Sequence, residues 1–241
     1  MSKTSPRQTR RARREHARTS SPRPRSRRRF TIPQIAAVSV LAVAAVIGFV
    51  WLGNAQSTPP ASTLSPTITQ NGHIRGVANA PVTIEEWADF QCPACGQFAR
   101  LTEPQLLSTY GAKGQVSVVF HHFAFLGQES SWAAEAAECA GEQGKFFEFH
   151  DKLYASQAGE NRGAFSKDNL KKLGADLGLA SSFNACVDSG RLAQTVRDDT
   201  KVGEGRGVQA TPTLFVNGRK IEGAATFEQL RTIIDPLLVG R

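Results

Sequence analysis

The sequence predicts an α/β fold with a helical domain inserted between two parts of a sheet, preceded by one transmembrane helix. Three observations predict the α/β part. Strand patterns at 82–87 and from Gln115 flank a helical pattern, helical patterns alone fill 127–207, and strand patterns return after Ala210. A strand, a helix and a strand of these lengths form a right-handed unit with a parallel sheet.

The basic residues are concentrated at the start of the chain. Residues 1–30 contain 12 Lys and Arg and one acid, Glu15, for a net charge of +11. The whole chain has 29 bases and 21 acids, which leaves 17 bases and 20 acids after Phe30, or −3. The excess of positive charge therefore belongs to a basic cytoplasmic tail, 1–31. Although nucleic acid is a common partner of basic chains, we expect none here, because anionic lipid headgroups beside a membrane segment are a simpler partner.

Residues 32–53 are predicted to be a transmembrane anchor or an export signal. They contain "IAAVSVLAVAAVIGFVWL", Ile35 to Leu52, which has no charge over 18 residues. This length suits a hydrocarbon core of about 30 Å. The arginines before it predict a cytoplasmic N-terminus and an extracytoplasmic remainder in the cell membrane. A buried helix is the alternative, and small residues after the segment leave cleavage open. Residues 54–71, rich in Ser, Thr and Pro, are predicted to form a flexible linker.

The folded region is predicted to begin near residue 72. Its first part, 72–126, contains a strand, a helix that Pro104 should kink or interrupt, and a second strand. A helical insertion, 127–207, follows, and its helices are predicted at 131–140, 145–156, 167–177, 181–188 and 191–202. The last part, 208–241, contains two strands joined by a tight turn at Asn217-Gly218 and a final helix at 226–238.

The motif "QCPACG" lies between the first predicted strand and the helix that follows it, which places Cys92 at the helix N-terminus. Unpaired backbone N–H groups and the positive end of the helix dipole stabilise a thiolate there. Pro93 suits the first helical position because it has no N–H to lose. The thiolate attacks in disulfide exchange and leaves readily, while Cys95, one turn later, can close a disulfide with Cys92. The motif therefore predicts a redox dithiol.

Half of a zinc site is the alternative interpretation of two cysteines at this spacing. Such a site needs a second pair of ligands. Cys139 and Cys186 stand singly, and His121 and His122 point to opposite faces if they end a strand. We therefore favour the redox pair, expect no metal ligands and no cofactor, and assign these histidines and His150 no role.

Three stretches resemble the DsbA-type disulfide oxidoreductases of the thioredoxin fold, particularly their membrane-anchored and lipid-anchored bacterial relatives. These are "VTIEEWADFQCPACGQF", "ECAGEQGKFFEFHDKLY" and "GVQATPTLFVNG". The resemblance covers about residues 72–238 and has the motifs in the expected order. It implies a thioredoxin fold that carries an inserted helical domain, in agreement with the order of the predicted elements.

The resemblance also implies roles for residues outside the dithiol. Thr211 and Pro212 match the family's cis-proline loop, whose backbone would bind a substrate peptide in a strand-like manner; a plain strand-entry proline is the alternative. Glu86 matches the family's buried acid and would relay a proton to or from Cys95. Glu86 alternates with the apolar residues Val82 and Ile84, so its side chain should point to the buried face of the strand. The alternative is that Glu85 faces inward and Glu86 faces solvent.

The residues between the cysteines leave the redox direction open. In this family the two middle residues tune the oxidising strength, and Pro93 and Ala94 would also border a bound substrate. The strongest oxidants carry a histidine where this chain has Ala94, and an alanine offers the thiolate no charge or hydrogen bond.

The remaining cysteines, Cys139 and Cys186, both lie in predicted helices of the insertion. Assigning Cys92 to Cys95 leaves only this pair, and an oxidising compartment favours a structural disulfide between them. Two buried free thiols are the alternative.

These observations predict an extracytoplasmic thiol-disulfide oxidoreductase that donates a disulfide to cysteine-containing exported proteins. The resemblance implies reoxidation by a membrane quinone-linked partner of the DsbB or vitamin K epoxide reductase (VKOR) type. A reductase or isomerase is the nearest rival, and a non-catalytic, chaperone-like binding module is a more distant one.

Overall fold

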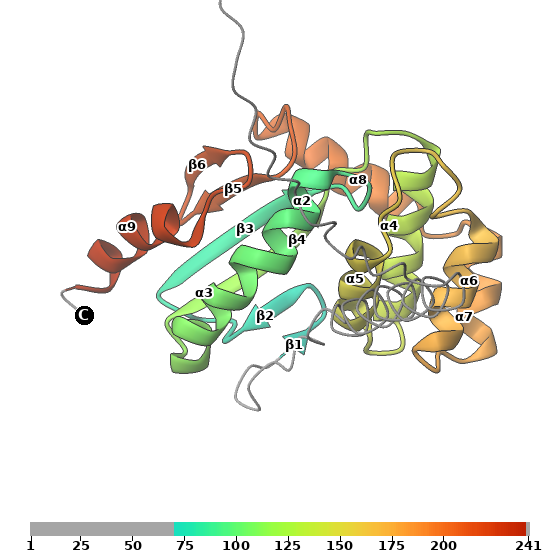
Figure 1. The fold of residues 1–241 in the computed structure, drawn as a ribbon, viewed down its shortest axis with the longest axis horizontal. Coiled ribbons are helices and arrows are strands. Elements are labelled where there is room, and N and C mark those ends of the chain that lie inside the picture. Colours follow the sequence, from blue (N-terminus) through green and yellow to red (C-terminus); the bar gives the residue numbers. More distant parts are fainter. Residues whose placement is uncertain (1–69, 240–241) are drawn as a thin grey trace, which may run out of the picture. The chain divides into compact units, whose positions relative to one another are not determined.

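The computed structural model describes residues 70–239. The basic tail, the predicted membrane segment Ile35–Leu52 and almost all of the predicted linker lie outside the described residues. Within 70–239, no helix combines the length and the apolar character needed to cross a bilayer. The described part contains a six-stranded sheet of order β1-β2-β4-β3-β5-β6 (Figure 1).

The centre of the sheet confirms the predicted strand–helix–strand unit. Strand β3 (Val82–Ala88) pairs in parallel with β4 (Val116–His122) and antiparallel with β5 (Thr213–Val216). Strand β6 (Arg219–Glu222) pairs antiparallel with β5. The turn between them is Asn217-Gly218, where both residues have positive φ values of 46° and 84°. Asn and Gly tolerate this left-handed region, which a two-residue hairpin turn requires.

The connection from β3 to β4 is a helical run in several segments. Helix α2 (Pro93–Gln97) continues into a π-helical turn, η1 (Phe98–Thr102), and then into α3 (Glu103–Thr109). A 3-10 turn, η2 (Gly111–Lys113), leads to β4. The predicted interruption of the helix is therefore a π-helical turn, and it lies before Pro104. Pro104 itself lies in the first turn of α3, where a missing N–H is tolerated.

An edge hairpin at the start of the described residues was not predicted. It consists of β1 (Gln70–Asn71) and β2 (Ile74–Gly76), and β2 pairs antiparallel with β4. A Cβ atom at Gly76 would lie 2.6 Å from the carbonyl oxygen of Val116, so only glycine fits this close approach. The hairpin is too short to show a strand pattern in the sequence, and its contacts with β4 come from a segment more than 40 residues away.

Five helices separate β4 from β5 and confirm the predicted helical pattern, with ends that shift by up to three residues. They are α4 (Gln128–Gly141), α5 (Phe146–Ala155), α6 (Lys167–Asp176), α7 (Ser181–Ser189) and α8 (Ala193–Gly205). Helices α4 to α7 pack together beside the sheet, and α8 returns to pack against β4 (Figure 1). Helix α9 (Phe227–Leu238) ends the described region and begins with a capping box between Thr226 and Gln229.

Both faces of the sheet are covered. On one face α3 and α9 bury an aliphatic core that includes Val82, Ile84, Leu106, Leu107, Leu214 and Ile234. On the opposite face α8 approaches Trp87 closely at Gly203, where a Cβ atom would lie 2.6 Å from the indole ring. A third, aromatic core joins the sheet to the helical domain and includes Phe90, Phe120, Phe146, Phe149 and Tyr154. Alternation along β3 therefore sends Val82, Ile84 and Glu86 to the first face.

Candidate active site

The two cysteines of the motif begin helix α2. Cys92 is the N-cap residue, in an extended conformation with φ −67° and ψ 119°, and Pro93 is the first helical residue. Both cysteines are free thiols. Cys92 retains 7% of its exposure and Cys95 has none, while the neighbouring Pro93 is exposed and Ala94 is half-buried. Only the first sulfur of the pair is therefore accessible to another protein.

The surroundings of Cys92 favour its thiolate. Hydrogen bonding with the Cys95 thiol lowers the pKa of Cys92 most, and hydrogen bonds with Thr211 and with the backbone of Cys95 and Ala94 lower it further. Burial acts in the opposite direction, but the net result is a pKa of about 6. A free cysteine has a pKa of about 8.5. At neutral pH Cys92 is therefore mostly ionised, which is the form that exchanges disulfides.

Cys95 has the opposite character. Burial raises the pKa of its thiol well above the usual value, and the hydrogen bond and charge interaction with Cys92 raise it further. The charge interaction with Glu86 acts in the same direction. Cys95 therefore remains a protonated thiol beside the Cys92 thiolate. This difference separates an attacking sulfur from a resolving one.

The loop before β5 lies against the dithiol. The peptide bond between Thr211 and Pro212 is cis, and in the thiol form the Sγ atom of Cys92 donates a hydrogen bond of 3.3 Å to the carbonyl oxygen of Thr211. The fold therefore brings together Cys92, Cys95, Thr211 and Pro212 from the two parts of the sheet. The backbone at Thr211 borders the sulfur of Cys92, which is the partly exposed one of the two.

Glu86 is fully buried on the inner face of β3. Neither of its carboxylate oxygens has a hydrogen-bond partner among the described residues. Burial raises the pKa of Glu86 well above its usual value, and the charges of Glu103 and Cys92 raise it further, while Arg75 opposes them. A carboxyl group with a raised pKa, whose charged form interacts with both cysteines, is suited to deliver and accept protons during thiol exchange.

A buried ion-pair network modifies the charge around Glu86. Arg75 of β2 is 3% exposed and lies 3.1 Å from Glu103 Oε1 and 2.7 Å from Asp151 Oδ2. Its guanidinium also covers the ring of Phe147 at 4.2 Å. The sequence analysis missed this network, because its residues come from three separate segments and no local pattern shows that these segments meet. Burial and the charge of Glu103, which itself pairs with Arg75, outweigh the opposing charge of Arg75, so the pKa of Glu86 is raised on balance.

Two further residues that the sequence analysis missed support the backbone of the motif. Asp89 accepts hydrogen bonds from the backbone N–H groups of Gln91, Phe125 and Leu126. Gln157, after α5, donates to the carbonyl oxygens of Phe90 and Cys92 at 2.8 and 2.9 Å. Both side chains connect the start of α2 to the segments that follow β4 and α5. The one sequence signal for Asp89 is an acidic residue directly after the apolar strand β3, which ends at Ala88.

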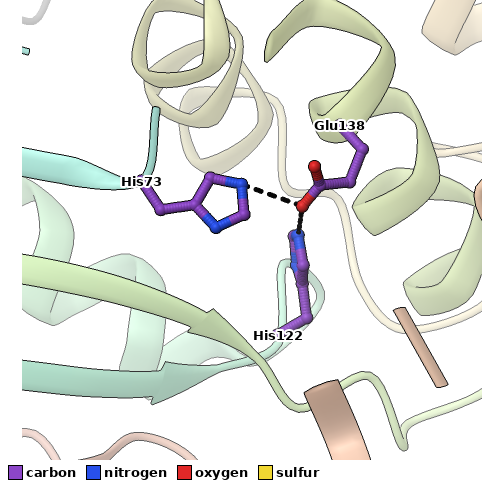
Figure 2. Close-up of side chains that lie close together, drawn as sticks. All are labelled: His73, His122 and Glu138. Carbon is purple, nitrogen blue, oxygen red and sulfur yellow. Dashed lines mark hydrogen bonds and ion pairs between the residues drawn. The ribbon is translucent and has the colours of Figure 1, made fainter. Parts of the chain in front are cut away.

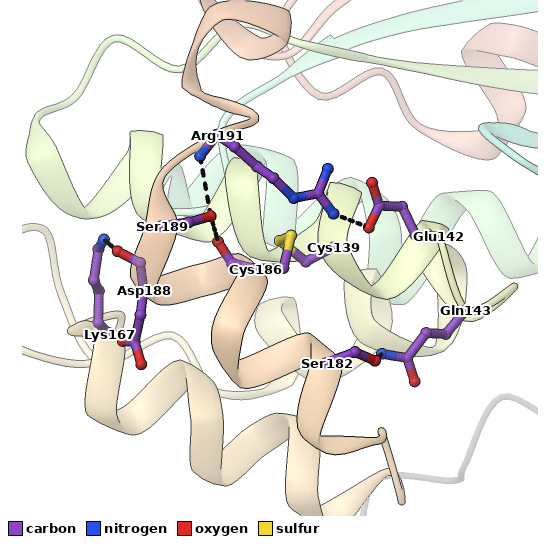
Figure 3. Close-up of a disulfide and its surroundings, with 9 residues drawn as sticks. All are labelled: Cys139, Glu142, Gln143, Lys167, Ser182, Cys186, Asp188, Ser189 and Arg191. Carbon is purple, nitrogen blue, oxygen red and sulfur yellow. Dashed lines mark hydrogen bonds and ion pairs between the residues drawn. A yellow bond between two sulfur atoms is a disulfide. The ribbon is translucent and has the colours of Figure 1, made fainter.

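Cys139 and Cys186 lie away from the motif, in α4 and α7. The structure joins them by a disulfide with a Cα–Cα distance of 5.9 Å (Figure 3). Two polar contacts flank the bridge: Arg191 pairs with Glu142, and Gln143 donates a hydrogen bond of 3.2 Å to Ser182. The bridge and these contacts hold two helices of the helical domain together.

Known proteins share both the fold and the sequence pattern. A family model described as Thioredoxin matches residues 68–236. The chain is 34% identical over 177 residues to the Na(+)/H(+) antiporter NhaA 1 of Salinispora arenicola, a match that covers 73% of this chain and 26% of that protein. The chain thus spans about a quarter of the length of the first curated relatives it matches.

Two further similarities cover most of both partners. The chain is 27% identical over 172 residues to disulfide bond formation protein D of Bacillus subtilis, which covers 70% of this chain and 78% of that protein. The crystal structure of oxidised BdbD from Bacillus subtilis is similar with a TM-score of 0.65 at 27% identity, and the match covers 70% of this chain and 94% of that structure.

Proposed function

Because the chain belongs to the thioredoxin family, as a protein of the DsbA type, we propose that it is a thiol-disulfide oxidoreductase that donates a disulfide to exported proteins. The contrast between the two sulfurs carries this proposal. Cys92 has a pKa of about 6 and a small exposed area, whereas Cys95 is fully buried and its pKa is raised. A structural pair of cysteines needs no such difference.

In the oxidised protein a disulfide joins Cys92 and Cys95. A substrate thiolate attacks the Sγ atom of Cys92, the bond between the two cysteines breaks, and its electron pair passes to Cys95. The sulfur of Cys95 then takes up a proton, because its raised pKa disfavours the thiolate, and Glu86 is the carboxyl group that supplies it. A mixed disulfide between the substrate and Cys92 results.

The second step releases the product. Another thiolate of the substrate attacks the substrate sulfur of the mixed disulfide and displaces the Cys92 thiolate. The low pKa of Cys92 makes it a good leaving group. In total the substrate loses two electrons and two protons. The protein gains the two electrons and ends with a Cys95 thiol and a Cys92 thiolate, and Glu86 regains a proton from solvent. Thr211 and Pro212 would align the substrate backbone during both steps, with Pro93 and Ala94 beside it.

Return to the oxidised form requires an external oxidant. A membrane quinone-linked partner of the DsbB or VKOR type fits a protein anchored in the cell membrane with its dithiol outside the cytoplasm. The apolar segment 35–52 and the arginines before it support this location. Cysteine-containing exported proteins would be the substrates in that compartment.

Oxidation of a reduced, unfolded protein in the presence of glutathione disulfide tests the proposal. The purified full-length chain should accelerate formation of the substrate disulfides, and Cys92→Ser should abolish the acceleration. Cys95→Ser should accumulate a mixed disulfide that migrates with the substrate on a non-reducing gel. If the wild-type protein gives no acceleration over glutathione disulfide alone, the proposal is wrong.

A reductase or isomerase is the second candidate, because Ala94 gives the Cys92 thiolate no extra charge or hydrogen bond. Equilibration with glutathione separates the two directions. A reduction potential of about −120 mV, as in a strong oxidant, favours disulfide donation, and one of about −270 mV favours reduction. If Cys92→Ser left the cellular role of the protein intact, a non-catalytic binding module would replace both candidates.

A further inference from the structure

Three side chains with metal-binding atoms converge where the sheet meets the helical domain (Figure 2). His73 lies in the turn between β1 and β2, His122 ends β4, and Glu138 lies in α4. The Nε2 atoms of both histidines point to the same carboxylate oxygen, Oε1 of Glu138, at 2.9 Å from His73 and 2.8 Å from His122. All three potential ligand atoms lie within 4.8 Å of one another.

Each of the three residues is held in place by its own contacts. The carbonyl oxygen of His73 accepts a hydrogen bond of 2.9 Å from the backbone N–H of Phe120 in β4. The ring of His122 is 1% exposed and packs edge-on against Phe120, with ring centroids 5.3 Å apart. Glu138 precedes Cys139, whose disulfide ties α4 to α7. The cluster is therefore largely preorganised.

The distances match those of a metal site after a small adjustment. Zinc binds histidine nitrogens and carboxylate oxygens at roughly 2.0–2.2 Å, so two ligands of a tetrahedral ion stand about 3.3 Å apart. The two contacts to Glu138 Oε1 measure 2.8 and 2.9 Å. Opening these contacts by about half an ångström and bringing the two histidine ligand atoms, which lie within 4.8 Å of each other, closer together would give all three ligand atoms the spacing of a metal site. Both changes require only side-chain rotations.

The chemistry of the three ligands selects the class of ion. Imidazole nitrogen suits zinc and other late transition metals, whereas calcium and magnesium prefer sites built from oxygen alone. We propose that His73, His122 and Glu138 form a binding site for one divalent transition-metal ion, for which zinc fits best. The side chain of His73 is 32% exposed, so a water molecule can reach the fourth position of a tetrahedral ion.

A metal ion at this position would connect three segments that are distant in sequence. His73 belongs to the edge hairpin, His122 to the sheet, and Glu138 to the helical domain. The site therefore joins the two parts of the fold, and it stabilises the folded protein because the unfolded chain does not hold the ligands together.

Zinc titration of the full-length, untagged protein tests the site. The protein is first oxidised, so that Cys92 and Cys95 cannot act as ligands, and is then stripped of metal with a chelator. Isothermal calorimetry should show one zinc ion bound for each chain. Zinc should also raise the thermal unfolding temperature, and calcium should do neither.

His73→Gln is the main variant, because its side chain is partly exposed and the fold should tolerate the change. It should weaken zinc binding by about a hundredfold or more, since loss of even an outer-shell partner costs roughly 10–100-fold. Glu138→Gln keeps an acceptor oxygen for both histidines but removes the ligand charge, and it should weaken binding similarly. His121→Gln is the matched control, because His121 points to the other face of β4, where it stacks on Trp87.

Three results would overturn the proposal. The first is the absence of stoichiometric zinc binding to the oxidised wild-type protein. The second is equal affinity in the wild-type protein, His73→Gln and Glu138→Gln. The third is an equal loss of affinity in His121→Gln. Because the dithiol is oxidised throughout, none of these results depends on the proposed redox activity.

Discussion

The Sγ atom of Cys92 lies 3.3 Å from the carbonyl oxygen of Thr211, although 119 residues separate the two along the chain. This contact joins the start of α2 to the loop that precedes β5. A substrate strand that pairs with the backbone at Thr211 would place its cysteine beside the partly exposed sulfur of Cys92. Under the proposed function, this contact would place the bound peptide directly beside the sulfur that exchanges disulfides.

Alkylation of the reduced protein should follow the ionisation of Cys92. The thiolate is the reactive form and predominates above the pKa of Cys92, so the rate should rise with pH through a midpoint of about 6 and then level off. Iodoacetamide labelling followed by mass spectrometry measures the rate at each sulfur. Cys95 should stay unlabelled in the folded protein because it is fully buried. A midpoint near about 8.5, as for free cysteine, would contradict this prediction.

Glu86→Gln should make the stability of the protein less sensitive to pH. The folded-state pKa of Glu86 is raised by burial, so the folded protein binds this proton more tightly than the unfolded chain does. The resulting stability is present below the unfolded-state pKa of about 4.3 and is lost as pH rises towards the folded-state value. The unfolding free energy of Glu86→Gln relative to wild type should therefore increase with pH.

Denaturant unfolding at several pH values measures this difference. Glu85→Gln, on the opposite face of β3 and paired with Arg206, controls for the loss of one carboxyl group. The same Glu86→Gln variant should also slow reduction of the Cys92–Cys95 disulfide at neutral pH, since proton delivery to Cys95 is impaired. A constant stability difference across the pH range would argue against a raised pKa.

Removing the second disulfide should lower stability without changing the dithiol. The bridge between Cys139 and Cys186 closes a loop with a sequence separation of 47, for which the loss of loop entropy corresponds to about 4 kcal/mol. The double variant Cys139→Ala/Cys186→Ala should unfold at lower denaturant by about this amount. The pH dependence of Cys92 alkylation should remain that of the wild type. A shift in the alkylation midpoint would show that the bridge also shapes the active site.

Two glycines of α8 should respond to the same substitution in opposite directions. Gly203→Ala places a Cβ atom 2.6 Å from Trp87 and 2.8 Å from Phe123, and such overpacking should cost about 1–3 kcal/mol. Gly205→Ala meets no atom within 4 Å and should stabilise the helix by up to about 1 kcal/mol. Thermal unfolding of both variants measures the contrast. Equal effects would mean that α8 does not pack on the sheet as described.

Local patterns were sufficient to predict the elements that carry the dithiol. The alternation of apolar and polar residues predicted β3, and the Cys-Pro motif predicted the start of α2. The pair Asn217-Gly218 predicted the turn of the last hairpin. The resemblance to a known family pointed to Thr211, Pro212 and Glu86, whose positions depend on contacts across the sheet. The positions of the five inserted helices followed from their periodicity, with errors confined to their ends.

Features that arise only when distant segments meet were not predictable in this way. The edge strand β2 is three residues long and exists because it pairs with β4. The ion pairs of Arg75 with Glu103 and Asp151 and the meeting of His73 with Glu138 have the same origin. The sequence of a short segment does not indicate which distant segment it will contact. Neither composition nor periodicity could therefore predict these contacts.

The central strand β3 is paired on one side by β4 and on the other by β5, which follows the five inserted helices in the chain. A premature stop codon before Thr211 would therefore leave a polypeptide with both thiols, one unpaired edge on its middle strand and no loop to align a client. Such a truncated product would react without selectivity and would associate through its open edge.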